Sequence, residues 1–556
     1  MVRYISLLLF IGLVFSVSNA QEWQPSFVAG NLDVNGSFIG GSEILHLVTH
    51  KDKLFASVGY WEDENNIWYG GNDFNLGWAQ IIRLDNADDI WEVDFDLGLF
   101  HLRPEILKEV IFTKDYYGNP LDTPDTLLMV GSYSPNFLSG YVTASIFIRN
   151  DENGEWDQIV VHEGGFPAGE NYSMRDIELY TDQITGIEHL IISVGTKGIF
   201  TGKYNPNLDS KIEFDLNPEI GPLSIRPLGI TIANNSLYFS SGNKIFRRND
   251  GQNPTYDVVH DFIDLGSNIN SAVGGIRGLS TISIPSGLYE SMLLMWCPNG
   301  QSQGTIFRLD PNGSQGFDRV YDAKISLLVE DYLPGVTVTY LLGAYNEFYP
   351  FSDPINNEAY HVIGIESLLQ GENYPTWNGF YSGAIFVLRD SSAQYELEEI
   401  NGPIDFEDNP LVAIRCYVTT PFENENAMYF GGFDPNSYSS TNNAWIYKKI
   451  WNNLDLYEKD PALVTDFIIH QNYPNPFNPV TTLRYDLHQD ALVNITVYDM
   501  MGRVVNNLVS SQQNAGYKCI QWNATNDADQ PVSAGLYLYT IQAGDFRQIK
   551  KMVLLK

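Results

Sequence analysis

The sequence predicts an all-β protein: a seven-bladed β-propeller followed by a small β-sandwich. One strand pattern recurs seven times along residues 21–455, and each recurrence belongs to a group of four strand-like runs with almost no helical pattern between them. The last 86 or so residues then change in composition and begin with a proline-rich arm. A long repeat built only from strands is typical of a propeller, whose blades are four-stranded sheets.

The recurring strand has two adjacent apolar residues at its centre. Steps between successive pairs run from 46 to 79 residues and average about 61, which exceeds common helical repeats and suits a four-stranded sheet with generous loops. The seven pairs are Ile81-Ile82, Ile146-Phe147, Ile199-Phe200, Ile245-Phe246, Ile306-Phe307, Ile385-Phe386 and Trp445-Ile446.

The other strands of each unit flank this centre. A hydrophobic run that ends in Gly or another turn residue precedes it, and in most units a further strand-like run follows it. The preceding runs are 54–61, 127–133, 190–196, 237–243, 293–300, 340–346 and 428–434, and the following runs include 89–95, 156–162, 317–323 and 394–400. With an innermost strand at its start, each unit becomes four strands in succession. No strand carries the signature of an identified propeller family.

Closure of the ring needs a strand from the other end of the chain, because an open last blade leaves an unpaired edge. The last unit ends near Ile450 without a clear fourth strand, whereas Ser26 to Val34 is an unassigned extended stretch. We therefore expect the N-terminal segment to form the outer strand of the final blade. The unit from Ile325 to Ile400 is the longest and contains an insertion from Glu347 to Tyr381, so six or eight blades remain alternatives.

The first 20 residues have the pattern of a secretory signal peptide. Arg3 is the positive n-region, Ile5 to Val17 the apolar h-region, and Ser18 to Ala20 a small-residue cleavage site. The apolar run of about 13 residues is shorter than the roughly 20 that span a bilayer, and no later stretch is longer. We expect export to the periplasm and no transmembrane segment.

The tail opens with QNYPNPFNPVTTLRYDL and closes with KKMVLLK. Pro474, Pro476 and Pro479 fix φ and remove backbone donors, so Asn472 to Pro479 is expected to be an extended arm. The runs 493–508, 515–527 and 534–544 alternate apolar and polar residues or end in Gly and Asp turns, which suits a small β-sandwich.

These tail residues resemble the type A sorting domain of the type IX secretion system of Bacteroidota-like bacteria. The resemblance implies an immunoglobulin-like fold of the flagellar hook-capping type, the type IX machinery as a partner, and a protein that reaches the outer cell surface or the medium by way of the periplasm. The residues that carry the implied sorting signal are Asn472, Tyr473, Pro474, Asn475, Pro476, Phe477, Asn478, Pro479, Gly502, Gly535, Lys550 and Lys551.

Charge separates the tail from the body. The chain carries a net charge of −36, yet residues 468–556 hold seven Lys/Arg against six Asp, about +1, which leaves about −37 upstream. This step predicts domains at 21–455 and 471–556 joined by a linker at 456–470. An acidic body excludes nucleic acid and anionic lipid as favoured partners, because both are bound by clustered Lys and Arg.

Six cations stand near the start of the innermost strands, where the inter-blade loops meet at the mouth of the channel. They are Arg103, Arg175, Arg226, Arg277, Lys324 and Arg415, and only the first unit differs, with Glu43. One interpretation is a ring that binds an anionic ligand such as a carboxylated sugar, because guanidinium groups form forked bonds to carboxylates. The other is that each cation is a structural staple, paired to a neighbour such as Glu105 or Asp176, since six unpaired cations in one channel repel each other.

Other motifs point to no cofactor, metal or catalytic residue. The stretch Asn31 to Ser37 begins like a calcium loop but lacks its final acid, so it predicts a simple turn. Glu62 to Glu64 are expected to be a solvated acidic loop, and Cys297, Cys416 and Cys519 buried thiols. Loop aromatics that could stack on sugars are Trp68, Tyr69, Trp78, Tyr374 and Trp377.

Two functional hypotheses from different classes follow. The first is a non-catalytic secreted or surface protein whose propeller binds a glycan, peptide or protein. The second is a secreted propeller hydrolase or lyase that acts on an acidic polysaccharide or another anionic substrate. Carboxylates and a histidine clustered beside the arginines, with shifted pKa values, would favour the enzyme, whereas a mouth of paired arginines and aromatics would favour binding.

Overall fold

The computed structural model describes residues 23–555 except 137, 166–170, 267–268, 270–274, 284–288, 300–302, 314–315, 344, 354–357, 372–373, 375, 378, 401–410, 423–424, 434–441, 451–467, 470–471, 473–476, 478, 480, 488, 490, 514–515, 528–529 and 545. The chain divides into two compact units, Met1–Trp451 and Asn452–Lys556. The predicted signal peptide lies outside the described residues, as does the predicted linker apart from Ile468 and Ile469.

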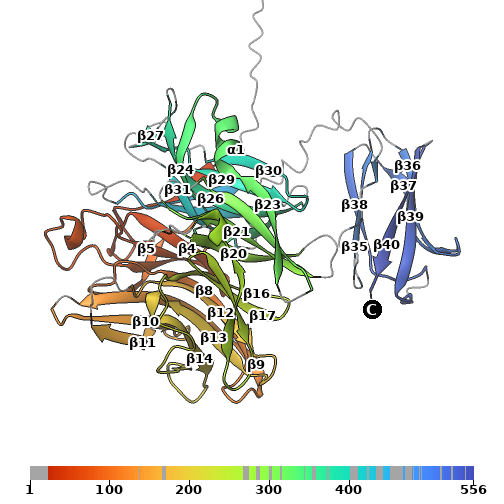
Figure 1. The fold of residues 1–556 in the computed structure, drawn as a ribbon. Helices are drawn as coiled ribbons and strands as arrows, with labels where there is room; N and C mark the ends of the chain where they lie inside the picture. Colours follow the sequence, from red (N-terminus) through yellow and green to blue (C-terminus); the bar gives the residue numbers. More distant parts are fainter. Residues whose placement is uncertain are drawn as a thin grey trace, which may run out of the picture. The chain divides into compact units, whose positions relative to one another are not determined.

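The first unit is a seven-bladed β-propeller, in which antiparallel sheets of four strands follow one another around the body (Figure 1). Strands are named from the innermost outward. Blade 1 consists of β4 (Glu43–His50), β5 (Lys53–Gly59), β6 (Gln80–Leu84) and β7 (Glu92–Asp96), and blade 2 of β8 (Ile106–Lys114), β9 (Pro120–Asn136), β10 (Tyr141–Arg149) and β11 (Trp156–Gly165). Blade 3 consists of β12 (Met174–Thr181), β13 (Glu188–Val194), β14 (Gly198–Tyr204) and β15 (Ile212–Phe214), and blade 4 of β16 (Pro227–Ala233), β17 (Ser236–Ser241), β18 (Lys244–Asn249) and β19 (Thr255–Asp261).

The remaining three blades follow the same plan with one elaboration. Blade 5 consists of β20 (Gly275–Ser283), β21 (Glu290–Cys297), β22 (Thr305–Pro311) and β23 (Phe317–Lys324); blade 6 of β25 (Tyr349–Ser352), β26 (Ala359–Gln370), β29 (Ile385–Asp390) and β30 (Tyr395–Glu399); and blade 7 of β31 (Ala413–Thr419), β32 (Ala427–Phe433), β33 (Trp445–Ile450) and β1 (Trp23–Val28). Short elements outside the blades are the hairpin β2 (Asn31–Leu32) and β3 (Phe38–Ile39) and the 3-10 turns Ile67–Tyr69, Gly195–Lys197 and Ile263–Leu265.

The paired apolar centres all fall on the third strand of a blade, and packing explains why. Successive residues of a strand point to opposite faces of the sheet, and both faces of a blade meet a neighbouring blade. In β10, Ile146 packs with residues of blades 2 and 3, whereas Phe147 packs with residues of blades 1 and 2, and both are buried. Two adjacent apolar residues are therefore what a strand enclosed between two blades requires.

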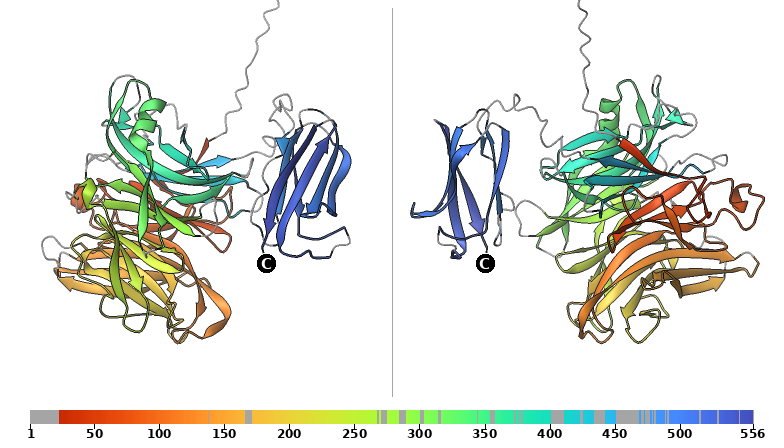
Figure 2. Two further views of the ribbon diagram at one scale, coloured as in Figure 1. Left: turned by 45° about the vertical axis from the view of Figure 1, so that its right-hand side comes forward. Right: turned by 180° about the vertical axis from the view of Figure 1, so that it is seen from behind.

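The ring closes with a strand from the N-terminus, as the sequence predicts. β1 pairs antiparallel with β33, from Trp23 opposite Lys449 to Val28 opposite Trp445 (Figure 2, right). The pairing segment begins earlier than expected and ends at Val28, because the chain beyond it turns back in the β2–β3 hairpin. Blade 7 is joined to blade 1 by the pairing of Phe433 with Glu43.

Blade 6 differs from the sequence prediction. The run 340–346 is not a second strand: most of it belongs to β24 (Thr337–Gly343), which lies in line with β25 along the second strand β26. The interval from Glu347 to Tyr381 is likewise not only an insertion, since it contains β25 and β26. The true additions are helix α1 (Ile325–Tyr332), β24, and the small strands β27 (Thr376–Trp377) and β28 (Phe380–Tyr381).

The second unit is a β-sandwich with its own core. One sheet contains β34 (Ile468–Ile469), β35 (Thr481–Leu487) and β38 (Gly516–Trp522), and the other contains β37 (Val504–Gln513), β36 (Ala491–Asp499), β39 (Gly535–Ala543) and β40 (Phe546–Leu554). Val493, Ile495 and Val497 alternate inward along β36 and are fully buried. No helix among the described residues is long and apolar enough to cross a membrane.

Candidate functional site

The central channel is lined by the innermost strands, and most of these strands carry a β-bulge near their start. The register shifts lie between Ile44 and His46 in β4, Met174 and Ile177 in β12, Pro227 and Gly229 in β16, Arg277 and Ser280 in β20, and Ile414 and Cys416 in β31. A bulge re-aims side chains that would otherwise alternate between the two faces of the sheet. Repeated at the same level, the bulges turn long polar side chains toward the axis.

Four of the six predicted cations meet at this level. Arg175, Arg277 and Arg415 lie at or beside the bulges of their strands, and Arg103 lies in the segment just before β8. We call these four residues the arginine cluster. Arg226 precedes β16 and donates a hydrogen bond of 2.8 Å to Ser173 Oγ.

Lys324 does not take the predicted position. The sequence after it forms α1 rather than an innermost strand, so Lys324 ends β23, the outermost strand of blade 5. The apolar run at 325–329 has the composition of a strand, but its burial follows a helix, with Ile325, Ser326 and Val329 inside. The prediction failed because one short apolar run does not distinguish the two.

A tyrosine of the protein itself occupies the arginine cluster. Residues 345–348 lie between β24 and β25, outside the sheet, and bring Tyr345 into the channel. Its hydroxyl oxygen lies 2.7 Å from Arg103 Nη2 and 2.5 Å from Arg175 Nη1, and its carbonyl accepts from Arg175 Nη2 at 3.2 Å. The guanidinium carbons of Arg415 and Arg175 lie 3.9 and 4.2 Å from the centre of its ring.

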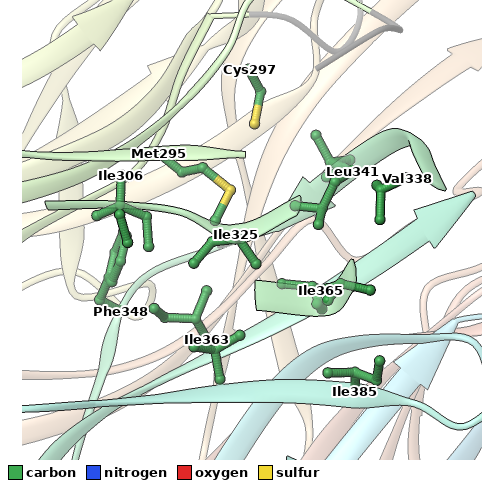
Figure 3. Packing of buried hydrophobic residues seen from close by; sticks show 14 of the residues in the cluster. Met295, Cys297, Ile306, Ile325, Val338, Leu341, Phe348, Ile363, Ile365 and Ile385 are labelled. Carbon is green, nitrogen blue, oxygen red and sulfur yellow. The ribbon is translucent and has the colours of Figure 1, made fainter. Parts of the chain in front are cut away.

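The segment that carries Tyr345 is held from both sides. Asn346 Nδ2 donates to the carbonyl of Leu45 at 2.8 Å, and the backbone N–H of Phe348 donates to Ser280 Oγ at 2.9 Å. Phe348 is buried in the core between blades 5 and 6, which Met295, Ile325 and Ile363 share with it (Figure 3).

Carboxylates balance part of the charge. Glu43 accepts two bonds from Arg103, at 2.5 and 2.8 Å, and Glu366 accepts one from Arg415 at 3.0 Å. Burial lowers the pKa of Arg103, but the charges of Glu43 and Tyr345 outweigh this effect and hold the pKa above its ordinary value. Burial, reinforced by the charge of Arg175, lowers the pKa of Arg226 to about 10.

The two carboxylates named as partners of the cations, Glu105 and Asp176, differ in what they contact. Arg103 Nη1 lies 3.7 Å from Glu105, one of the two carboxylates named for that role. Asp176, the other, accepts the backbone N–H groups of Ile177 at 2.8 Å and Ile230 at 2.6 Å, and so ties blade 3 to blade 4.

A pocket of about 300 Å³ occupies the channel beyond Tyr345. We call it the channel pocket. Arg175, Arg415 and His46 line it, and so do residues further along the innermost strands and the segment after Tyr345: Val48, Lys108, Asp176, Glu178, Thr231, Thr281, Glu347, Phe348, Pro350 and Tyr417. The pocket thus contains both donors and acceptors, beside apolar walls from Phe348 and Val48.

Its ionisable groups interact strongly. Lys108 Nζ donates to Glu178 at 2.5 Å and to the carbonyl of Ile177 at 2.8 Å. Burial raises the pKa of Asp176 to about 7, with Lys108 opposing the shift and Glu178 adding to it. Burial, aided by the charge of Glu178, also raises the pKa of Glu347.

His46 borders the pocket as a neutral imidazole. Burial and the charges of Arg175 and Arg103 lower its pKa to about 4. Since the ring is uncharged at neutral pH, Nε2 carries the hydrogen and donates to the carbonyl of Glu105 at 2.8 Å. A histidine and three carboxyl groups therefore stand in the same channel as the arginines.

Sequence reasoning missed Tyr345 and the ionisable groups of the channel pocket. The only sequence signal for Tyr345 is the unusual length of its repeat unit. Lys108, Asp176 and Glu178 cannot be distinguished in the sequence from the solvent-facing polar residues of ordinary strands. It also missed a repeated arginine beyond the paired centre of the third strand. Among the described residues, these arginines bind carboxylates at the blade junctions, as Arg83, Arg149, Arg248, Arg308 and Arg389 do.

The candidate aromatics are mostly packed. Trp78 is buried, Trp68 and Tyr69 are half-buried, and Tyr374 is half-buried beside Tyr381. The side chain of Trp377 lies outside the described residues. Trp61, which the sequence analysis did not single out as a sugar-stacking residue, is exposed and receives a cation–π contact from Arg103 at 5.2 Å.

The other minor motifs are structural. Asp33 accepts the backbone N–H groups of Asn35 and Ser37, as expected of a turn, and no group of ligands for a metal occurs among the described residues. Asp63 is buried and accepts backbone N–H groups from Asn65 and Asn442, so it is not solvated as the sequence suggested. Cys297 and Cys416 are buried free thiols, and the side chain of Cys519 is not described.

The described sorting residues are integrated into the sandwich. The backbone N–H of Asn472 donates to Tyr539 at 2.8 Å, and buried Phe477 pairs with Leu554 beside Trp522. Gly502 forms the turn after β36 with φ near 76°, and Gly535 begins β39. Lys550 and Lys551 lie on β40, half-buried and exposed respectively. Tyr473, Pro474, Asn475, Pro476 and Asn478 lie outside the described residues, and Pro479 is exposed.

Residues 471–555 match the family described as secretion system C-terminal sorting domain. The tail is therefore a type IX sorting domain, which directs the protein by way of the periplasm to the cell surface or the medium. Comparison with curated proteins gave no match.

Three solved structures illustrate the likeness of the body to other propeller proteins. PorZ, a surface component of the type IX secretion system of Porphyromonas gingivalis, is 11% identical with a TM-score of 0.28 and covers 93% of this chain and 82% of its own. A fungal alcohol oxidase of the AA5 family in complex with copper is 10% identical with a TM-score of 0.38, covering 96% and 99%. An α-L-arabinofuranosidase of Fusarium graminearum is 10% identical with a TM-score of 0.37, covering 77% and 98%. At these TM-scores the likenesses carry no argument about ligand or activity.

Proposed function

We propose that this exported protein is a binding protein that holds the end of a glycan in the channel pocket. The observation that supports the proposal is the chemistry of the pocket. Lys108 and the hydroxyls of Thr231 and Thr281 stand beside the carboxyl groups of Glu178 and Glu347. Sugar hydroxyls both donate and accept hydrogen bonds, so a mixed lining of this kind suits them. A volume of about 300 Å³ is at the small end of ligand pockets and fits a terminal sugar unit.

The charge of the pocket favours a neutral sugar over the anionic ligand expected from the arginines alone. Lys108 donates to Glu178. The guanidinium group of Arg103 donates to Glu43, and that of Arg415 donates to Glu366. Three carboxyl groups thus line the cavity, whereas its cations are already engaged: Lys108 by Glu178, Arg415 by Glu366 and Arg175 by Tyr345. A uronic acid would add a further negative charge to this end. Of the residues predicted to bind a ligand, Arg175 and Arg415 line the inner end of the pocket.

A second function, cleavage of a polysaccharide by a hydrolase or lyase reaction, is favoured by one observation. Asp176, with a pKa of about 7, lies near Glu178 in the same pocket, and a carboxyl group that titrates near neutrality can act as a general acid. Its oxygens already accept two backbone N–H groups. We rank binding first because this coordination gives Asp176 a structural role.

The test is a binding screen on the mature chain from residue 21, with neutral, amino and uronic oligosaccharides and parallel assays for shortened products. A neutral oligosaccharide should bind without being cleaved, and Glu347→Gln should weaken binding about tenfold or more, because one hydrogen bond to a charged group contributes about 1.5–3 kcal/mol. Glu152→Gln, in an exposed turn of blade 2, is the matched control and should bind as the unaltered chain does.

Each of the other outcomes contradicts a named part of the proposal. Equal binding by Glu347→Gln and the control would place the ligand elsewhere. Release of shortened products would favour the hydrolase or lyase. Preference for uronic oligosaccharides would favour an anion site over the neutral one.

A further inference from the structure

The starting observation is a buried tyrosine surrounded by guanidinium groups. Tyr345 is 9% exposed, and the arginine cluster supplies a cation from the start of blades 2, 3, 5 and 7. Two of the cations, Arg103 and Arg175, donate to the same phenolic oxygen. A neutral phenol rarely attracts two charged donors, whereas a phenolate has the lone pairs and the charge for both.

The surrounding charges favour an anion at this oxygen. Glu43 neutralises Arg103 and Glu366 neutralises Arg415, while Arg175 donates to the hydroxyl and carbonyl oxygens of Tyr345 itself. Glu105 and Arg226 are the next charged groups outward, and His46 is neutral, so none of these reverses the balance at the phenol. Cations gathered away from water repel one another unless an anion lies between them.

The titration behaviour agrees with this geometry. Burial raises the pKa of Tyr345, yet the charges of Arg103, Arg175 and Arg415 outweigh burial and lower the pKa to about 7. Every other tyrosine with a resolved shift among the described residues moves in the opposite direction, as Tyr340 and Tyr417 do. An unperturbed tyrosine ionises near pH 10, so Tyr345 should titrate alone.

We propose that the arginine cluster is an anion-binding site whose resident ligand is the phenolate of Tyr345. The phenolic proton leaves to solvent, and the negative oxygen stays between Arg103 and Arg175. The site takes a small monoanion of the phenolate class, and the chain supplies that anion itself. The phenolate also anchors the segment that carries Asn346 and Glu347 into the channel pocket, although the site stands independently of any ligand there.

Ultraviolet absorbance at 295 nm, where phenolate absorbs and phenol does not, tests the proposal directly. The full mature chain should show a step equivalent to the ionisation of one tyrosine, with a midpoint near pH 7. Tyr345→Phe should remove that step, and Tyr340→Phe, which changes a half-buried tyrosine of β24, should retain it. If Tyr345→Phe does not fold, the unaltered chain alone tests the proposal, because a constant absorbance at 295 nm between pH 6 and 8.5 would overturn it.

A second measurement tests the site without its resident ligand. In Tyr345→Gly, 4-nitrophenol should bind and show its yellow phenolate at a lower pH than it does in buffer, because the vacated cluster favours the anion. The same ligand should show no such shift with the unaltered chain, in which Tyr345 fills the site. No shift in a folded Tyr345→Gly chain would overturn the anion site, whatever glycan the protein binds.

Discussion

Arg248 gives the sharpest test of how the blades are held together. Its side chain is 1% exposed and donates to Asp182 and Asp250 at 2.7 Å and to Glu219 at 2.7 and 3.0 Å. Asp182 and Glu219 belong to blade 3, and Arg248 is on β18 of blade 4. Burial raises the pKa of Asp182, but Arg248 and backbone N–H groups outweigh it and hold the pKa well below its ordinary value.

Arg248→Met keeps an unbranched apolar stem and removes the guanidinium group with its charge. Three carboxylates, one of them fully buried, then lose their common cation. Breaking a buried ion pair by removal of one partner costs about 3–5 kcal/mol, because the remaining charge is left without compensation. The propeller should therefore lose about 3–5 kcal/mol of unfolding free energy.

Urea denaturation followed by tryptophan fluorescence measures this loss, since ten of the eleven tryptophans precede residue 452. Arg247→Met is the matched control: Arg247 adjoins Arg248 on β18, and its ion pair, 3.9 Å long, is with the exposed Asp257. The control should lose about 1 kcal/mol or less. Equal losses in the two variants would refute the assignment of Arg248 as the inter-blade tie.

Four further outcomes are expected. A chain that ends at residue 465 should keep a folded propeller yet accumulate in the periplasm, as cell fractionation would show; loss of the propeller fold would make the tail a structural domain. Deletion of residues 23–30 should expose the edge of β33 and cause aggregation, visible by light scattering, whereas a monodisperse product would contradict closure by β1. Trp522→Ala should cost the sandwich about 3–5 kcal/mol in calorimetry without shifting the propeller transition, because Trp522 is buried in the tail's own core. The pKa of Tyr345 is about 7 in the folded chain and near 10 in the unfolded chain, so ionisation of Tyr345 stabilises the fold fully above pH 10, and this stabilisation is lost as the pH falls through about 7. Relative to Tyr345→Phe, the free energy of unfolding should therefore rise by up to about 4 kcal/mol between pH 7 and pH 10, and a pH-independent difference would refute the prediction.

The fold was largely predictable because blade packing imposes a local pattern. A third strand enclosed by two blades needs adjacent apolar residues, and Ile146 with Phe147 shows this pattern in the sequence before any contact is known. Closure by the N-terminal segment followed from the missing fourth strand of the last unit. Blade 6 was not predicted correctly because α1 and β24 precede its innermost strand β25, and a period of about 60 residues does not reveal such additions.

The sequence by itself determined the propeller, the sandwich and the destination of the protein, because each depends on periodic or local signals such as paired apolar centres and the sorting motif. Only the tertiary structure decided what the arginines face. Tyr345 meets Arg103 and Arg175 across 242 and 170 residues of chain, respectively. Contacts of that separation depend on the ring being closed and on the path of one irregular segment, which neither composition nor spacing encodes.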